Sequence, residues 1–210
     1  MTTETTPVSI QREPELAGQT VVVLGGSAGI GLETARRARA EGAEVILTGH
    51  NPDRLEQAAT DVGTQRTAAF DANDTAALAR FFHVLQTPID HVLVTAGGPR
   101  YAPLLEMDSD EVREQLSGHV VLGLEVARNA ASKMRPVRVN LIAAGFVDTP
   151  LSASLLGDRL DERRKELRTT LPIGRVVGPA DVAALAVHIM SNTALTGATY
   201  DIDGGQQFVF

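Results

Sequence analysis

The 210-residue sequence predicts one α/β domain with a doubly wound parallel sheet. Three observations lead to this fold class. Strand-like and helix-like segments alternate through the first half with short connections, as in parallel sheets with right-handed crossovers. The apolar run at residues 21–24 is β-branched and has the length of a strand buried on both faces. Three spaced glycines, Gly25, Gly29 and Gly31, follow it directly and open a helical stretch.

The first half supplies most of the sheet. Residues 1–15 are rich in Thr, Glu and Pro, so we expect a flexible lead-in before a domain at residues 16–210. Asn51-Pro52 is a helix start with an N-cap and a proline at the first helical position, and Gly63 ends that helix. Asp74 caps the next helix. The expected strands are 21–24, 45–48, 67–70 and 91–95, with helices at 32–41, 52–62 and 75–85.

The second half begins with a longer element. Asp108 and Glu111 form a capping box, and we expect one long helix from residue 111 to about 134, ended by Pro136. The remaining expected elements are a strand at 137–142, a polar helix at 158–168, an apolar helix at 179–191, and a last strand and turn at 200–205.

The carboxyl ends of the strands are where ligands bind in such folds. Gly25 can make the strand-to-helix turn, Gly29 lets the backbone approach a phosphate, and Gly31 lets the helix pack closely. The first N–H groups of that helix, with its dipole behind them, favour an anion. A glycine-rich turn without a ligand is the competing interpretation.

Composition excludes several function classes. The net charge is −7 and no segment clusters Lys or Arg, which argues against nucleic acid and anionic membrane surfaces as partners. The absence of cysteine excludes disulfides and thiolate chemistry. The histidines show no metal-ligand spacing, so we expect no metal site. No apolar run reaches spanning length and no signal pattern is present, so we expect a soluble cytoplasmic protein.

The motifs together resemble the short-chain dehydrogenase/reductase family. Residues 25–31 look like its T-G-x-x-x-G-I-G loop, with Leu24 in place of Thr. Thr95-Ala96-Gly97 is similar to its N-A-G motif, and residues 139–149 are similar to V-N-x-x-x-P-G-x-x-x-T, with Ala144 in place of Pro. Matching segments follow in order at residues 172–175, 178–183, 196–197 and 203–205, so the resemblance covers about residues 16–207.

The resemblance implies a Rossmann-type fold, an NAD(P) cofactor, hydride transfer on a small-molecule carbonyl/alcohol pair, and a homo-oligomer (dimer or tetramer). Asp71 would meet the adenine or simply cap a helix, and Thr149 would hold the nicotinamide carboxamide or be a turn hydroxyl. The candidate cofactor-binding residues are Gly25, Ser27, Ala28, Gly29, Ile30, Gly31, His50, Asn51, Asp71, Ala72, Ala96, Gly97, Gly98, Val147 and Thr149.

The family's catalytic Ser and Tyr-x-x-x-Lys are missing. They belong to a strand and helix between the long helix and the V-N strand, whereas here Pro136 runs directly into Val137. Neither Tyr101 nor Tyr200 is followed by Lys four residues on, so no catalytic residue is assigned. His119, at the position of the family's catalytic Asn, is a replacement acid or an ordinary helix histidine.

Three explanations of the missing unit remain open: a deletion that still folds, a member that has lost its active site, or a longer molecule with a segment between Pro136 and Val137. The third is favoured because losing a central strand should cost more than a domain's few kcal/mol of net stability. If the catalytic residues are truly absent, the alternative function is an inactive NAD(P)-binding protein, a sensor or partner subunit. A flavin or sugar-nucleotide enzyme is a more remote alternative. His50, with no acid beside it at the end of the second strand, favours NADP over NAD.

Overall fold

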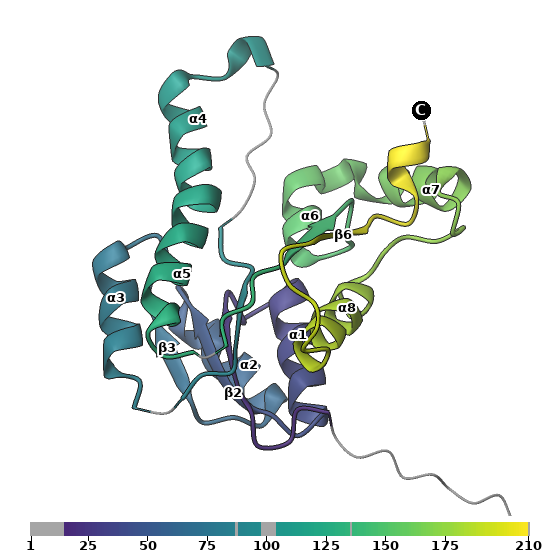
Figure 1. Ribbon diagram of the computed structural model, residues 1–210. Helices are drawn as coiled ribbons and strands as arrows, with labels where there is room; N and C mark the ends of the chain where they lie inside the picture. The colour runs from purple at the N-terminus through teal and green to yellow at the C-terminus, as the bar shows by residue number, and fades with distance from the viewer. Residues whose placement is uncertain (1–14, 87, 98–103, 135, 210) are drawn as a thin grey trace, which may run out of the picture.

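The computed structural model describes residues 15–86, 88–97, 104–134 and 136–209. A four-stranded parallel sheet occupies the first half, in the order β3-β2-β1-β4 (Figure 1). Its strands are β1 (Thr20–Leu24), β2 (Glu44–Gly49), β3 (Thr67–Ala69) and β4 (His91–Val94). The predicted parallel α/β architecture is confirmed, with strand boundaries shifted by at most one residue.

Helices cover both faces of this sheet because alternate residues of β1 point to opposite sides. Val21 and Val23 pack with α1 (Gly29–Ala40), α2 (Pro52–Val62) and α8 (Pro179–Ser191). Val22 and Leu24 pack with α3 (Thr75–Val84) and α5 (Leu122–Ala131) on the other side. All of β1 is buried, so the turn that follows it is anchored on both faces.

The predicted helix caps of the first half are confirmed. Asn51 accepts a hydrogen bond from the Arg54 N–H at 2.9 Å, and Gly63 ends α2 in the left-handed conformation at φ 73°. Asp74 accepts the N–H groups of Ala76 and Ala77, both at 2.9 Å.

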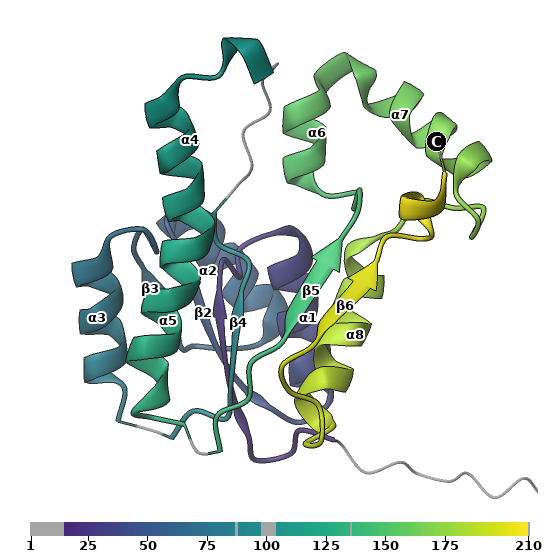
Figure 2. The same ribbon diagram turned by 45° about the horizontal axis from the view of Figure 1, so that its top comes forward.

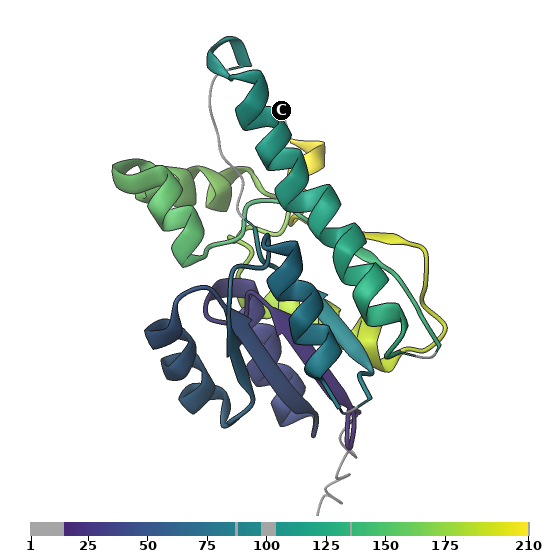
Figure 3. The same ribbon diagram turned by 90° about the vertical axis from the view of Figure 1, so that its left-hand side faces the viewer.

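The predicted long helix is present but interrupted. It consists of α4 (Ser109–Leu116), a π-helical turn at Ser117–Val121, and α5. A short 3₁₀ turn, Leu104–Glu106, precedes it. Figures 1 and 3 show α4 projecting beyond the sheet. Apolar side chains are exposed along α4, the π-helical turn and the start of α5: Val112, Leu116, Val120, Val121 and Leu124.

The second half differs from the predictions in two places. The strand expected at residues 137–142 begins four residues later, as β5 (Leu141–Ala144). Arg138 lies before it and donates hydrogen bonds to the carbonyls of Met190 and Leu195, at and just after the end of α8. A helix not predicted, α6 (Pro150–Leu156), starts at Thr149-Pro150. A 3₁₀ turn at Gly157–Arg159 connects α6 to α7 (Leu160–Thr170), and the chain continues through α8 to β6 (Thr199–Ile202) and the 3₁₀ turn Gln206–Phe208.

The last two strands form a second sheet. β5 and β6 pair in parallel as a separate sheet on the β4 side of the first one (Figure 2). Among the described residues no hydrogen-bonded ladder joins β4 to β5. Val94 of β4 is 37% exposed and Leu141 of β5 is 61% exposed. The strand and helix that the family resemblance implies between Pro136 and Val137 are the chain segment missing before β5.

Candidate functional site

The turn after β1 is held in a conformation that only glycine fits. Gly25 has φ +90°, and it and Gly26 donate hydrogen bonds to the Thr48 carbonyl at the end of β2. A Cβ on Gly25 would lie 2.7 Å from the Ala96 nitrogen. A Cβ on Gly31 would lie 2.3 Å from the Gly25 carbonyl oxygen. The first turn of α1 therefore packs directly on backbone at the ends of β1 and β4.

The start of α1 lacks a side-chain cap. Its N-cap residue is Ala28, which has extended backbone and no side chain able to accept a hydrogen bond, and the first turn has no acidic residue. The first backbone bond of the helix runs from Leu32 N–H to the Ala28 carbonyl, which leaves the N–H groups of residues 29–31 at the open end. By contrast, Asn51, Asp74 and Thr149 cap α2, α3 and α6. The end of α1 is therefore suited to an external anion.

The end of β2 lies against this turn. A Cβ on Gly49 would stand 3.2 Å from the Ser27 hydroxyl oxygen, so Ser27 packs on the last residue of β2. His50 follows and is exposed. Asn51 uses its side-chain oxygen to cap α2, which leaves its amide nitrogen as the group able to donate to a ligand.

The ends of β3 and β4 complete this edge. Asp71 is exposed and accepts hydrogen bonds from the Asn73 N–H and side-chain amide at 2.9 and 3.2 Å, while Ala72 is buried. Ala96 N–H donates to the Leu24 carbonyl at 3.0 Å. Gly97 has φ +90°, and a Cβ there would meet the Gly118 carbonyl oxygen at 2.8 Å. The predicted contact Gly98 lies outside the described residues.

The π-helical turn lies against the chain just after β4, because Gly118 of this turn is next to Gly97. It contains His119, which is exposed and interacts with another group of the protein. π-helical turns are frequent at functional sites, and this one lies at the edge of the sheet where the ligand is expected.

The loop after β5 also contacts the glycine-rich turn and the start of α1. A Cβ on Gly29 would lie 3.5 Å from both Cβ and Cγ2 of Thr149, so Thr149 is next to Gly29. Val147 is buried, forms a β-bridge with Val177, and packs in one cluster with Ile30 of α1. The structure thus brings residues 25–31, 96–97 and 147–149 close together, and their contact with a cofactor stays a prediction.

Several polar contacts of the second half have no simple signal in the sequence. Arg164 of α7 makes a two-bond ion pair with Asp148, and Asp148 raises the pKa of this guanidinium. Arg138 donates to four carbonyls around the end of α8. These partners stand 16 or more residues apart, and only the fold brings them together.

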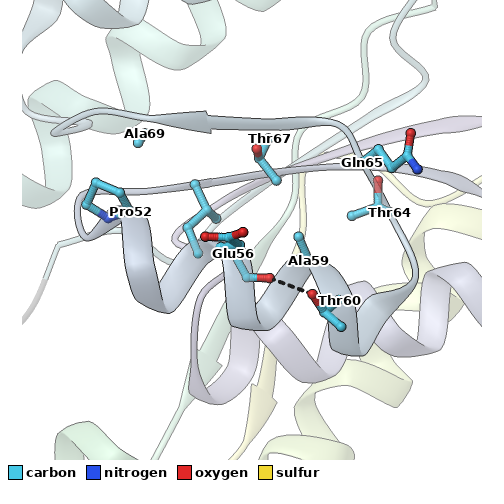
Figure 4. A pocket seen from close by; sticks show the side chains of 9 residues that line it. Pro52, Glu56, Ala59, Thr60, Thr64, Gln65, Thr67 and Ala69 are labelled. Carbon is cyan, nitrogen blue, oxygen red and sulfur yellow. Dashed lines mark hydrogen bonds between the residues drawn. The ribbon is translucent and has the colours of Figure 1, made fainter.

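Two surface hollows lie along α2, beside this edge. One of about 440 Å³ runs between α2 and β3 and is lined by Pro52, Leu55, Glu56, Ala59, Thr60, Thr64, Gln65, Thr67 and Ala69 (Figure 4). A second, of about 540 Å³, lies on α2 nearby. Neither includes the glycine-rich turn. The described residues contain no group of three or more metal-ligating side chains, and no helix among them is long and apolar enough to cross a membrane.

Comparison with known proteins identifies the family. The family model for short chain dehydrogenases matches residues 19–134, more than half of the chain, and the model for Enoyl-(Acyl carrier protein) reductase matches residues 121–207. An NADP-dependent (R)-specific alcohol dehydrogenase of Lentilactobacillus kefiri is 26% identical over 247 residues, covering 90% of this chain and 97% of that protein. The 3-oxoacyl-[acyl-carrier-protein] reductase FabG of Chlamydia trachomatis is 26% identical over 246 residues, with coverages of 90% and 98%.

Solved structures share the fold. BdcA in complex with NADPH superimposes with a TM-score of 0.79 at 22% identity, covering 91% of this chain and 95% of that one. The MalC Reductase/Diels-Alderase of Malbranchea aurantiaca gives a TM-score of 0.84 at 20% identity, covering 93% and 99%. The 247 aligned residues of the L. kefiri relative exceed the 210 residues of this chain, so that relative has internal residues without a counterpart here. The fold, the glycine-rich turn and the family models agree that this chain belongs to the short-chain dehydrogenase/reductase family of NAD(P)-dependent oxidoreductases.

Proposed function

We propose that this chain binds NAD(P)(H) across the carboxyl edge of the first sheet, with the pyrophosphate at the open end of α1. The observation that carries the proposal is the uncapped start of α1, placed by a turn whose glycines leave no room for side chains. Ser27 stands at the phosphate end, and Asp71 and Ala72 stand beside the adenine. Gly97, Val147 and Thr149 line the nicotinamide end.

The reaction proposed for this site is hydride transfer between the nicotinamide and a small carbonyl/alcohol pair. The nicotinamide supplies the hydride when it is bound. The carbonyl oxygen also needs a placed proton donor, because its developing negative charge must be neutralised. Family members use Tyr, Lys and Ser for this, and the motif that would hold them is missing from the sequence.

Nucleotide binding without turnover is the second candidate function. The observation that favours it is the absence of the Ser and Tyr-x-x-x-Lys motif from the sequence, together with a sheet that is divided between β4 and β5. His119, next to Gly118 in the turn that lies against Gly97, is the residue we propose as a replacement acid if turnover is observed.

Oxidation of NADPH in the presence of a panel of ketones and aldehydes separates the two candidates. Turnover that depends on the carbonyl compound would establish the oxidoreductase. Saturable NADPH binding with no turnover would establish the nucleotide-binding protein. Failure to bind either NADPH or NADH would reject both.

Three further properties belong to this proposal. NADP is preferred over NAD, because His50 rather than an acid follows β2. The chain forms a homo-oligomer, supported by the apolar side chains exposed along α4 and the π-helical turn. It works in the cytoplasm on a small molecule, and a chain of net charge −7 without cysteine fits this location.

A further inference from the structure

We propose that Arg164 is a positioning residue of the nucleotide site, which fixes the loop at residues 147–149 against the glycine-rich turn. This inference rests on the proposed binding of NAD(P)(H). Arg164 Nε donates to Asp148 Oδ2 at 2.9 Å, and Nη2 donates to Oδ1 at 2.8 Å, so the guanidinium engages both carboxylate oxygens. Such a two-bond pair fixes orientation as well as distance.

The loop held by this pair is the one that faces the proposed cofactor. Asp148 stands between Val147, which packs with Ile30 of α1, and Thr149, which lies against Gly29. On its other side the Asp148 N–H donates to the Val177 carbonyl at 3.0 Å. The backbone bond attaches this loop to Val177, and the ion pair with Arg164 attaches it to α7.

Arg164 also ties α7 to the rest of the protein. Leu167 is the one buried residue of this helix, so apolar packing gives α7 little attachment. Asp148 and Arg164 are each about 30% exposed, which places the pair at the rim of the site, where solvent screens it only in part.

Electrostatics gives the pair a second effect. A dinucleotide carries several negative charges, and an unpaired carboxylate beside its nicotinamide end would repel it. Arg164 offsets the charge of Asp148 in place, and its Nη1 also donates to Asp161 of α7 at 3.0 Å. Loss of the guanidinium therefore releases the loop and exposes a negative charge at the same point.

The test compares Arg164→Met with Arg163→Met. Arg163 is the adjacent residue on α7 and pairs with Glu166 of the same helix at 2.8 Å, so it is a matched control. Two probes are titrated by calorimetry: NADPH, and adenosine 2′,5′-bisphosphate, which lacks the nicotinamide half. We expect Arg164→Met to raise the Kd of NADPH about three- to tenfold and to leave that of the bisphosphate within about twofold. Arg163→Met should leave both unchanged.

Equal weakening of both probes would overturn the inference, because a purely structural role affects the whole site. Unchanged NADPH binding by Arg164→Met would overturn it as well. A wild-type protein that binds neither probe would instead reject the proposed function itself.

A rescue experiment keeps the test decisive if Arg164→Met folds poorly. Asp148→Asn in the Arg164→Met background removes the uncompensated charge, and we expect it to recover part of the lost NADPH affinity. Arg164→Lys, which keeps the charge without the two-bond geometry, should fall between wild type and Arg164→Met. Additive losses in the double variant would contradict the inference.

Discussion

Replacing Gly31 with alanine tests the packing on which the nucleotide site depends. The new methyl group would lie 2.3 Å from the Gly25 carbonyl oxygen and 2.6 Å from Thr95 Oγ1. The first is a backbone atom in a turn that is hydrogen-bonded to the end of β2, so it cannot rotate away. Either the start of α1 or the turn must move.

The expected cost follows from these distances. Forcing a methyl group into a filled space typically costs about 1–3 kcal/mol. Alanine returns up to about 1 kcal/mol because it favours the helix more than glycine does. The net loss of about 1–2 kcal/mol lowers the Tm by about 2–8 °C for a domain of this size. A shifted turn should also weaken NADPH binding by about tenfold.

Gly123→Ala is the matched control. Gly123 is also helical, in α5, and nothing lies within 4 Å of the Cβ position. Alanine there should raise the Tm by about 2–4 °C and leave NADPH binding unchanged. Thermal unfolding and NADPH titration of both variants measure these effects. A Gly31→Ala protein with the Tm and NADPH affinity of the wild type would refute the account of the turn.

Three other substitutions test other parts of the structure. Burial lowers the pKa of His91 to about 4, Asp90 opposing and Arg138 reinforcing the shift, so protonation favours the unfolded chain. Stability should therefore fall between pH 6.5 and 4, and His91→Gln should reduce that fall by about 1–2 kcal/mol; parallel unfolding curves for the two proteins would contradict this. His50→Asp should weaken NADPH binding by at least about tenfold and NADH binding far less, because a carboxylate there repels a 2′-phosphate; an unchanged ratio of the two Kd values would place the ribose elsewhere. Arg138→Met should cost about 2–3 kcal/mol, since its guanidinium donates to four carbonyls around the end of α8, and a Tm within 2 °C of wild type would show those bonds to be dispensable.

Local signals predicted the first half of the fold well. Asn51, Gly63 and Asp74 act as caps through groups close in sequence, and the alternation of buried residues in β1 follows from strand geometry. The same Xaa-Pro signal stands at Thr149-Pro150, where α6 begins, and it could have predicted that helix.

Long-range effects account for the differences. Residues 137–140 are apolar enough for a strand, but Arg138 binds carbonyls more than 50 positions away, and pairing with β6 starts only at Leu141. The division into two sheets is likewise a matter of which strands pair, and the sequence of neither β4 nor β5 alone determines that pairing.

The sequence could predict which residues lie near the candidate site, but not the ion pairs and hydrogen bonds between them. The strand-end rule grouped Gly25 with Ala96, and the family resemblance added Thr149; the structure places Ala96 against Gly25 and Thr149 against Gly29. The Arg164–Asp148 pair was not predicted, because it joins a polar helix to a loop and neither sequence is distinctive. Whether the site residues contact a nucleotide stays a prediction.

Amide hydrogen exchange with and without NADPH tests the central claim most directly, because it locates the ligand on the chain. The account predicts slower exchange at residues 25–32, 95–97 and 147–149 when NADPH is bound, with the groove between α2 and β3 unchanged. Protection confined to that groove, or no protection at saturating NADPH, would contradict it.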